Sequence, residues 1–183
     1  MQINTETGLL EPCLQCLSPN RDSRPHGTAI DLLVVHSISL PPGEYGGDAI
    51  ERFFQNKLDK NAHPYFEEIC EMQVSSHVLI KRSGEIVQFV PFHERAWHAG
   101  QSNYQGRERC NDFSIGIELE GTDSDIFEEA QYQQLAQLVT ALQTAYPAIS
   151  DNITGHSDIS PGRKQDPGTG FDWTRLKEKL DQR

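Results

Sequence analysis

The stretch DFSIGIELE, residues 112–120, predicts a β-strand and sets the fold class. Side chains of a strand point alternately to opposite faces. One face is apolar and consists of Phe113, Ile115, Ile117 and Leu119. The other face carries Ser114, Gly116 and Glu118. A base that reaches into a cleft above a sheet fits this second face, whereas a solvated carboxylate is the simpler alternative for Glu118.

Three further segments predict strands that accompany this one. The run LLVVH, residues 32–36, is apolar and rich in β-branched residues, which is typical of a strand covered on both faces. VSSHVLI (74–80) and EIVQFV (85–90) flank the turn KRSG and predict a hairpin. Because a hairpin contributes an antiparallel pair, we expect a mixed sheet rather than an all-parallel one.

Helices are predicted between and after these strands. Residues 48–58 have helical spacing, and residues 126–145 form a longer amphipathic pattern with a capping box at Asp125 and Glu128. The apolar stripe of the longer helix consists of Leu135, Leu138, Val139 and Leu142. A last helix is expected over residues 173–181.

The predicted fold class is therefore α/β, with a central mixed β-sheet flanked by helices. A chain of 183 residues is long enough for one domain that buries roughly 70% of its unfolded surface, so we expect a single domain over residues 1–183. Residues 1–30 are rich in Pro, Ser, Asn and Arg, and are expected to form an irregular arm on the surface.

The charge balance disfavours two classes of partner. Sixteen Lys and Arg against 27 Asp and Glu give a formal net charge of -11, which repels phosphate backbones and anionic lipid. No segment approaches the ~20 apolar residues of a transmembrane helix. We therefore expect neither nucleic-acid binding nor membrane binding.

The N-terminus and the cysteines indicate a cytoplasmic protein. The sequence MQINTETG at residues 1–8 lacks the basic start and apolar core of a secretion signal. In the cytoplasm the four cysteines are expected to stay reduced. Cys13 and Cys16 are closely spaced but have no second close pair to complete a four-thiolate zinc site, so we expect ordinary half-buried thiols.

A Pro- and Gly-rich loop, GHSDISPGRKQDPG at residues 155–168, contains His156 and Asp166, and His36 ends the apolar run 32–36. Two imidazoles and one carboxylate suit Zn²⁺, and three protein ligands leave a fourth position for water, as in catalytic zinc sites. From the residues alone, two alternatives stay open: His36 as a buried histidine paired with a carboxylate, and the loop as a surface turn.

Five segments, in the same order along residues 18–176, resemble the zinc-dependent N-acetylmuramoyl-L-alanine amidases. They are HSISLP from His36, VSSH from Val74, WHAG from Trp97, SIGIELEG from Ser114, and the loop 155–168. The resemblance implies the fold that peptidoglycan-recognition proteins share with the phage T7 lysozyme amidase. NYQGRERCNDF, residues 103–113, is closer to the cytoplasmic branch of the family, which acts on 1,6-anhydro-muropeptides.

The resemblance also implies roles for individual residues. The implied zinc ligands are His36, His156 and Asp166, and the implied catalytic pair is Glu118 and Lys164. The implied substrate contacts are Arg109 for carboxylates, Trp97 in the sugar or peptide groove, and Ser37 beside the metal. Close relatives commonly have Asn where this chain has Ser37, and some have Arg where it has Gln73. These departures concern contacts to the peptide and leave the zinc site complete.

The implied reaction is hydrolysis of the amide between the lactyl group of 1,6-anhydro-N-acetylmuramic acid and L-Ala of the stem peptide, by a monomer, in muropeptide recycling. Zinc lowers the pKa of its water to about 7 and polarises the carbonyl. Glu118 would pass the water's proton to the departing amine, and Lys164 would stabilise the oxyanion. Positive charge for an anionic substrate comes from Arg107, Arg109, Arg163 and Lys164.

Three other functions compete with this one. An amidase that acts on the intact cell wall outside the membrane is the first, and the lack of a secretion signal at residues 1–8 disfavours it. A muropeptide-binding module would bind cell-wall fragments without cutting them. Proteins that resemble this family do so when a zinc ligand is missing, whereas all three ligand positions are filled here. A purely structural zinc would need a fourth protein ligand, for which His77 is the candidate. We expect His77 and His98 to be pocket or core residues rather than ligands.

Overall fold

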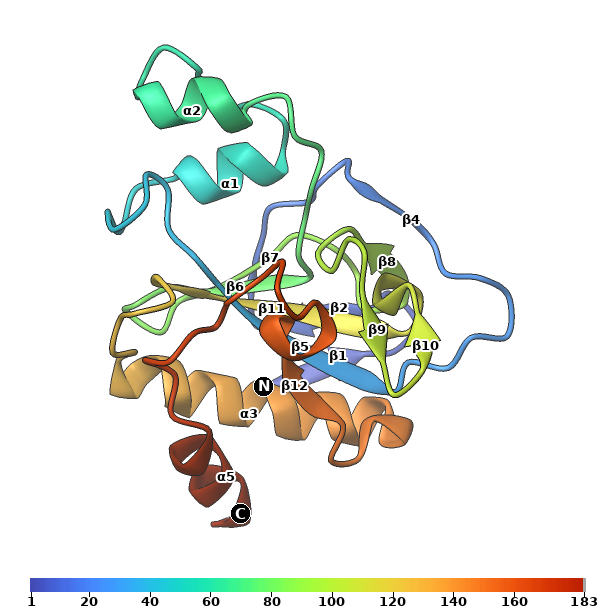
Figure 1. The fold of residues 1–183 in the computed structure, drawn as a ribbon. Coiled ribbons are helices and arrows are strands. Elements are labelled where there is room, and N and C mark those ends of the chain that lie inside the picture. Colours follow the sequence, from blue (N-terminus) through green and yellow to red (C-terminus); the bar gives the residue numbers. More distant parts are fainter. Residues whose placement is uncertain (183) are drawn as a thin grey trace.

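The computed structural model describes residues 1–182, and a six-stranded mixed sheet lies at its centre (Figure 1). The strand order across this sheet is β12-β5-β11-β6-β7-β3. The strands are β3 (Leu14–Gln15), β5 (Leu32–Ile38), β6 (Val78–Ile80), β7 (Ile86–Gln88), β11 (Ser114–Glu120) and β12 (Ile153–Gly155). The prediction of an α/β fold with a mixed sheet is confirmed.

Four neighbouring strands, β12, β5, β11 and β6, run parallel to one another, and β7 is antiparallel to β6. In this register Glu118 of β11 lies opposite His36 of β5, and Gly155 of β12 lies opposite Val35. The carboxyl ends of parallel strands meet at one edge of a sheet, where ligands commonly bind. That edge therefore receives His36, Glu118 and the loop that follows β12.

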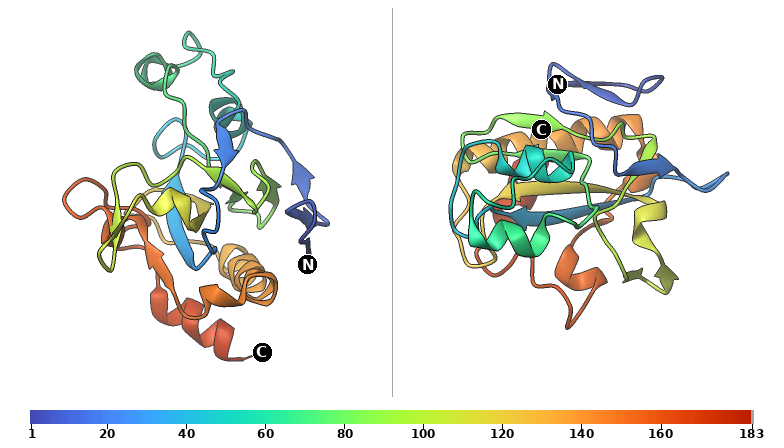
Figure 2. Two further views of the ribbon diagram at one scale, coloured as in Figure 1. Left: turned by 90° about the vertical axis from the view of Figure 1, so that its right-hand side faces the viewer. Right: turned by 90° about the horizontal axis from the view of Figure 1, so that it is seen from above.

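The helix α3 (Glu129–Ala145) covers one face of the sheet, and α5 (Trp173–Asp181) packs on α3 (Figures 1 and 2). The apolar row of β11 and the apolar stripe of α3 belong to one buried cluster, which includes Ile115, Ile117, Leu119, Leu135, Leu138, Val139 and Leu142. Each such side chain contributes about 1.5–3 kcal/mol when it is fully buried. The helical stripe read from the sequence is confirmed, and so is the alternation at Ile115, Ile117 and Leu119. Phe113 was expected in the same row, but it precedes β11 and belongs to a different buried cluster, with Leu32 and Val34.

The other face of the sheet is covered in part by α1 (Ala49–Phe54) and α2 (Pro64–Ile69). Their buried cluster contains Ile50, Phe53, Phe54, Phe66 and Ile69, packed with Leu79 and Val87 of the sheet. The helix predicted over residues 48–58 is shorter than expected, because Asn56 adopts a left-handed φ of 59°. The helix α2 was not predicted; His63 caps it by accepting from Tyr65 N at 3.1 Å.

The capping box predicted at Asp125 and Glu128 is wrong. The helix α3 begins three residues later, and its capping residues are Glu128 and Gln131, with Glu128 N donating to Gln131 Oε1 at 3.0 Å. The Asp125 carboxylate is engaged elsewhere, since it accepts from Thr122 N at 2.6 Å and from the Tyr45 hydroxyl. Asp125 thus belongs to a local turn, and the predicted helical residues 126–128 lie outside the helix.

The first 30 residues are more regular than the predicted irregular arm. Strands β1 (Gln2–Asn4) and β2 (Leu9–Glu11) form a hairpin that lies against α3 (Figure 2). Strand β3 extends the main sheet, and β4 (Arg21–Ser23) pairs with β8 (Glu94–Ala96). The buried Gln88 side chain anchors this segment, because it donates to Gly8 O at 3.0 Å and accepts from Leu10 N at 2.8 Å. A polar composition alone did not indicate this anchor.

Short elements complete the chain. They are β9 (Asn103–Tyr104), β10 (Arg107–Glu108), the 3-10 helices Cys110–Asp112 and Pro147–Ile149, and α4 (His156–Ile159). Cys13, Cys16 and Cys70 are half-buried free thiols, and Cys110 is a buried one. Over the described residues, no helix has both the length and the apolar character needed to cross a membrane.

Candidate metal centre and active site

Three ligand atoms from distant parts of the chain meet at the carboxyl edge of the sheet. The Nδ1 atoms of His36 and His156 lie 3.0 Å apart, and each lies 3.0 Å from Asp166 Oδ2. His36 comes from β5, His156 begins α4 directly after β12, and Asp166 comes from the following loop. Within the described residues, these three form the group that could hold a metal ion.

The donor set fits a zinc ion. In a tetrahedral zinc site with bonds of about 2.0–2.2 Å, ligand atoms lie roughly 3.3–3.6 Å apart, so this triangle is only slightly tighter. Both histidines are buried, and the Asp166 side chain is 17% exposed. Two nitrogens and one carboxylate oxygen converge without a fourth protein ligand from the same group, which leaves room for a water or a substrate oxygen.

The protonation states also suit metal binding. Burial lowers the pKa of His36 to about 4, although Asp166 opposes the shift, so this imidazole is neutral near pH 7. A neutral imidazole and an ionised carboxylate are the forms that bind a metal.

The far nitrogen of His156 has a carbonyl partner. His156 Nε2 lies 3.1 Å from Ala99 O, and a carbonyl can only accept. Arg163 Nη2 lies 3.3 Å from the same nitrogen, so a carbonyl and a guanidinium both face this side of the ring, while Nδ1 faces the other two ligand atoms. A backbone carbonyl behind a metal-bound histidine is the usual partner that fixes its orientation.

Glu118 lies beside this triangle with an unpaired oxygen. The residue is 8% exposed, and Glu118 Oε2 is buried without a hydrogen-bond partner. Burial raises the pKa of Glu118 well above its ordinary value, and the charge of Asp166 raises it further, while Lys164 lowers it. A buried carboxyl oxygen without a partner has the geometry of a group that exchanges a proton with a bound water.

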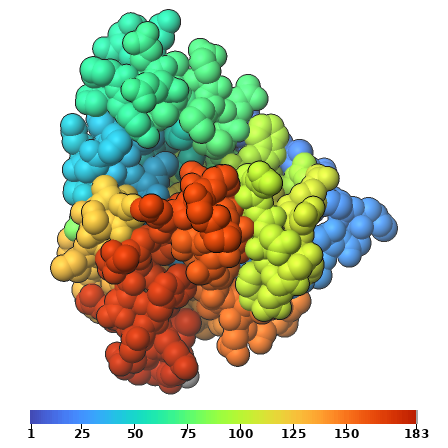
Figure 3. Space-filling view, in the orientation of Figure 1, coloured from blue at the N-terminus to red at the C-terminus, as the bar shows by residue number. Residues whose placement is uncertain are grey.

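A cavity of about 570 Å³ opens over the metal-binding group. Its polar lining includes the three candidate ligands together with Ser37, Glu118 and Lys164; Trp97 and His98 line it as well. Its apolar lining includes Phe53, Phe54, Tyr65, Ile69 and Met72. On this face the orange-red loop 155–168 lies between the α1–α2 segment and the yellow-green residues 99–110 (Figure 3).

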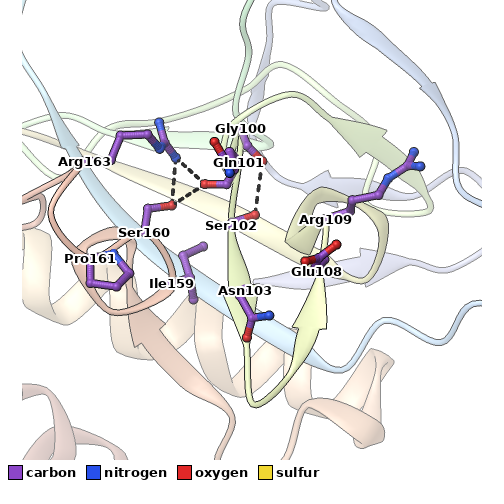
Figure 4. Close-up of a pocket in the computed structure, with 10 residues that line it drawn as sticks. All are labelled: Gly100, Gln101, Ser102, Asn103, Glu108, Arg109, Ile159, Ser160, Pro161 and Arg163. Atoms are coloured by element: carbon purple, nitrogen blue, oxygen red, sulfur yellow. Dashed lines mark hydrogen bonds between the residues drawn. The ribbon is translucent and has the colours of Figure 1, made fainter.

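Arg109 lies outside the cavity that contains the metal-binding group. Its side chain is 72% exposed, and it lines a separate pocket of about 390 Å³ with Gln101 and Ser160 (Figure 4). Arg163 lines both pockets, and its Nη2 donates to Ala99 O at 2.6 Å and to Gln101 O at 2.8 Å. Figure 4 shows Arg109 across the pocket from Arg163.

Two of the four cations predicted to bind an anionic substrate, Arg107 and Arg163, make contacts within the protein instead. Arg107 forms an ion pair with Asp31 at 2.7 Å and lies over the ring of Phe113. Arg163 is tied to main-chain oxygens by the contacts described above. Arg163 and Lys164 both line the metal cavity, and among the described residues the Lys164 side chain makes no such contact within the protein.

Three residues that the sequence analysis named without a role in the site lie close to the candidate ligands or to Glu118. His98 contacts the far nitrogen of His36, with 2.9 Å between His98 Nδ1 and His36 Nε2. Ser114 and Gly116 lie on the same strand face as Glu118, and both are small. Two small residues beside a functional carboxylate were a usable signal, since they leave space for another side chain above the sheet.

The fold and the site define a class of hydrolase. The chain belongs to the N-acetylmuramoyl-L-alanine amidase family, whose sequence profile matches residues 26–169. It is therefore an amidase of this class, as the five resembling segments imply.

Similar proteins carry a more specific name. The 1,6-anhydro-N-acetylmuramyl-L-alanine amidase AmpD of Escherichia coli (strain K12) is 58% identical over 172 residues, which cover 94% of this chain and 94% of that one. AmpD of Haemophilus influenzae is 56% identical over 171 residues, which cover 93% of each chain.

Solved structures agree with this assignment. A crystal structure of a Se-Met AmpD derivative matches with a TM-score of 0.95 at 57% identity, covering 98% of this chain and 99% of that chain. The amidase AmiD from E. coli, in complex with anhydro-N-acetylmuramic acid-L-Ala-D-gamma-Glu-L-Lys, matches with a TM-score of 0.61 at 32% identity. That match covers 85% of this chain and 60% of AmiD.

Proposed function

We propose that this chain is a zinc-dependent amidase that hydrolyses the amide between the lactyl group of 1,6-anhydro-N-acetylmuramic acid and L-Ala of the stem peptide. The observation that carries the proposal is the triangle of His36, His156 and Asp166 with the unpaired Glu118 Oε2 beside it. The names of the AmpD relatives and the ligand of the AmiD complex support the substrate.

The two histidines and Asp166 would hold the zinc. When bound, zinc supplies a Lewis acid for the carbonyl oxygen and lowers the pKa of a water molecule to about 7. Glu118 Oε2 accepts one proton of the attacking water and delivers it to the nitrogen of L-Ala as the C–N bond breaks. The products are a lactyl carboxylate on the sugar and a peptide with a free amine.

Lys164 stabilises the negative charge that develops on the carbonyl oxygen. It lies in the same cavity as the ligand atoms, and an ammonium near a developing oxyanion lowers the barrier more in a cavity than in open water. Lys164 lies two residues before Asp166, so both residues belong to the loop 155–168.

The cavity accommodates a substrate with a sugar and a peptide end. Trp97 and Ser37 line it and would contact the groups on either side of the amide. Arg109 would bind a carboxylate of the stem peptide only if the peptide extends past Arg163 into the second pocket. A cytoplasmic monomer that recycles muropeptides released from the wall is the proposed setting.

The proposal is tested by mass spectrometry of anhydro-muramyl-tripeptide incubated with zinc-loaded protein and with chelator-treated protein. Free anhydro-muramic sugar and free tripeptide are expected from the zinc-loaded sample, with activity restored to the treated sample by zinc. Bound but uncut substrate in both samples would instead indicate a muropeptide-binding module.

A further inference from the structure

A chain of hydrogen bonds leads from the back of His36 into the core. His36 Nε2 lies 2.9 Å from His98 Nδ1, and His98 Nε2 lies 3.2 Å from Ser114 Oγ. Ser114 Oγ in turn lies 2.6 Å from Cys110 O. His36, Ser114 and Cys110 are all buried, so each of these contacts replaces a contact with water.

The last contact fixes the direction of every proton in the chain. Cys110 O can only accept, and two oxygens 2.6 Å apart require a proton between them, so the Ser114 hydroxyl donates to Cys110 O. Ser114 Oγ must then accept from His98 Nε2. In a neutral ring this leaves His98 Nδ1 as an acceptor, and the proton of His36 therefore sits on Nε2.

We propose that His98 is a positioning residue that holds His36 in the tautomer whose Nδ1 is free to bind the metal. With the proton kept on Nε2, the Nδ1 lone pair of His36 points at His156 Nδ1 and Asp166 Oδ2, each 3.0 Å away. This inference rests on the proposed metal site. It adds that His36 is held for metal binding before the ion arrives.

Gly116 makes room for His98. A Cβ at this position would lie 2.5 Å from Cγ of the His98 ring, closer than such contacts occur. Its φ is not in the left-handed region, so the backbone does not explain the glycine. The missing side chain leaves space for the imidazole against the sheet, and this accounts for a glycine in the middle of β11.

Asn111 holds the backbone that carries His98. Its Oδ1 accepts from His98 N at 3.1 Å and from Ala99 N at 2.8 Å. Because Ala99 O lies 3.1 Å from His156 Nε2, the two residues of this segment contact the far side of both candidate ligand histidines. The His98 side chain contacts the far nitrogen of His36, and the Ala99 carbonyl contacts the far nitrogen of His156.

Three variants test the role of His98 through zinc affinity measured by chelator competition. His98→Ala should weaken zinc binding by about 10–100-fold, the usual cost of losing a hydrogen-bond partner behind a ligand. His98→Asn should recover most of this loss, because its Oδ1 can accept in place of Nδ1. Gly116→Ala displaces the ring without removing a polar atom and should also weaken binding, whereas His26→Ala on the exposed surface should leave it unchanged.

The tautomer of His36 gives a second readout that needs no zinc. Nitrogen-15 NMR of the metal-free wild-type protein should show His36 protonated at Nε2, and His98→Ala should show a mixture of tautomers. Protonation of His36 at Nδ1 in the metal-free wild type would overturn the inference, as would wild-type zinc affinity in His98→Ala. Equal losses in His98→Ala and His98→Asn would assign His98 a packing role and also overturn it.

These measurements separate this inference from the proposed function. A wild-type protein that fails to bind zinc would refute the proposed metal site, while the NMR experiment would still decide the tautomer. A zinc-binding wild type with an unaffected His98→Ala variant would refute only the role of His98.

Discussion

Glu118 lies directly opposite His36 on the neighbouring parallel strand, in register across β11 and β5. Paired residues of adjacent strands send their side chains to the same face, so the proposed base stands beside the first proposed metal ligand. The sheet sets the spacing between the backbones of Glu118 and His36, because neighbouring strands lie about 4.8 Å apart. The rest of the site is added by the loops that follow the strands.

Replacing Glu118 by Gln should separate metal binding from turnover. The amide cannot accept the proton of the attacking water, so we expect hydrolysis to fall by about 10²–10⁴-fold. Zinc affinity should stay within about threefold of the wild type, since Glu118 is not among the three ligands. Product formation by mass spectrometry and zinc content by elemental analysis check both parts; near wild-type turnover would remove Glu118 from the mechanism.

Lys164→Ala should lower kcat by about 10²–10³-fold, the usual loss of one donor to an oxyanion, with a smaller change in KM. Lys164→Arg keeps the charge and should retain part of the activity. The matched control is Lys177→Ala on the exposed surface of α5, which should not change either constant. A Lys164→Ala variant that raises KM alone would show that the lysine binds substrate without stabilising the transition state.

Gly168 and Gly162 offer a matched pair in the loop that carries Asp166. Both have left-handed φ values, 86° and 78°, so an alanine at either strains the backbone by about 1–2 kcal/mol. A Cβ at Gly168 would also lie 1.8 Å from Asp123 O, whereas a Cβ at Gly162 meets nothing within 4 Å.

We therefore expect Gly168→Ala, but not Gly162→Ala, to displace Asp166 and weaken zinc binding. Chelator competition on both variants checks this, with thermal unfolding to compare their stability. Equal zinc affinities in the two variants would mean that contact with Asp123 does not position the ligand loop.

Zinc should stabilise the folded protein. A ligand that binds only the native state at a hundredfold excess over its Kd adds about 2.7 kcal/mol to the free energy of unfolding. We expect the thermal midpoint of the wild type to rise with added zinc and the midpoint of Asp166→Ala to stay constant over the same range. A zinc-dependent shift of equal size in that variant would exclude Asp166 as a ligand.

His77 should make the metal-free protein less stable in acid. Burial, together with the Arg24 guanidinium, holds the pKa of His77 well below its ordinary value. As pH falls below about 6.5, the unfolded chain takes up a proton that the native imidazole does not, so the free energy of unfolding falls.

His77→Asn removes this titration but keeps an acceptor for the Gly116 N–H, which His77 Nδ1 accepts at 3.0 Å. Between about pH 6 and pH 5 the free energy of unfolding should fall less steeply in the variant than in the wild type. The two slopes should differ by up to about 1.4 kcal/mol per pH unit. Urea unfolding of the metal-free proteins measures the two slopes, with the exposed His26→Asn as control. Identical slopes for wild type and His77→Asn would contradict the assignment.

The sequence predicted the parts of this protein that depend on periodicity. The alternation in residues 112–120 placed Glu118 opposite an apolar row, and the stripe of α3 placed that helix on the same core. The run at residues 32–36 placed His36 at the carboxyl end of a buried strand. These features follow from local spacing, which is independent of the tertiary fold.

Other features depend on contacts that no local pattern contains. The distance between His98 and His36 is set by the path of residues 97–99 over the sheet, 62 positions from His36. Arg109 lines a second pocket, and its backbone is left-handed with φ at 61°, which no local spacing pattern indicates. The early end of α1 and the shifted start of α3 come from single residues whose side chains or φ values override helical spacing.

In the proposed reaction, water attacks the lactyl carbonyl in the cavity lined by His36, His156, Asp166 and Glu118. Hydrolysis of anhydro-muramyl-tripeptide in water enriched with oxygen-18 tests it directly by mass spectrometry of both products. We expect one heavy oxygen in the lactyl carboxylate of the sugar and none in the released tripeptide. Heavy oxygen in the peptide, or an uncut substrate with zinc bound, would contradict it.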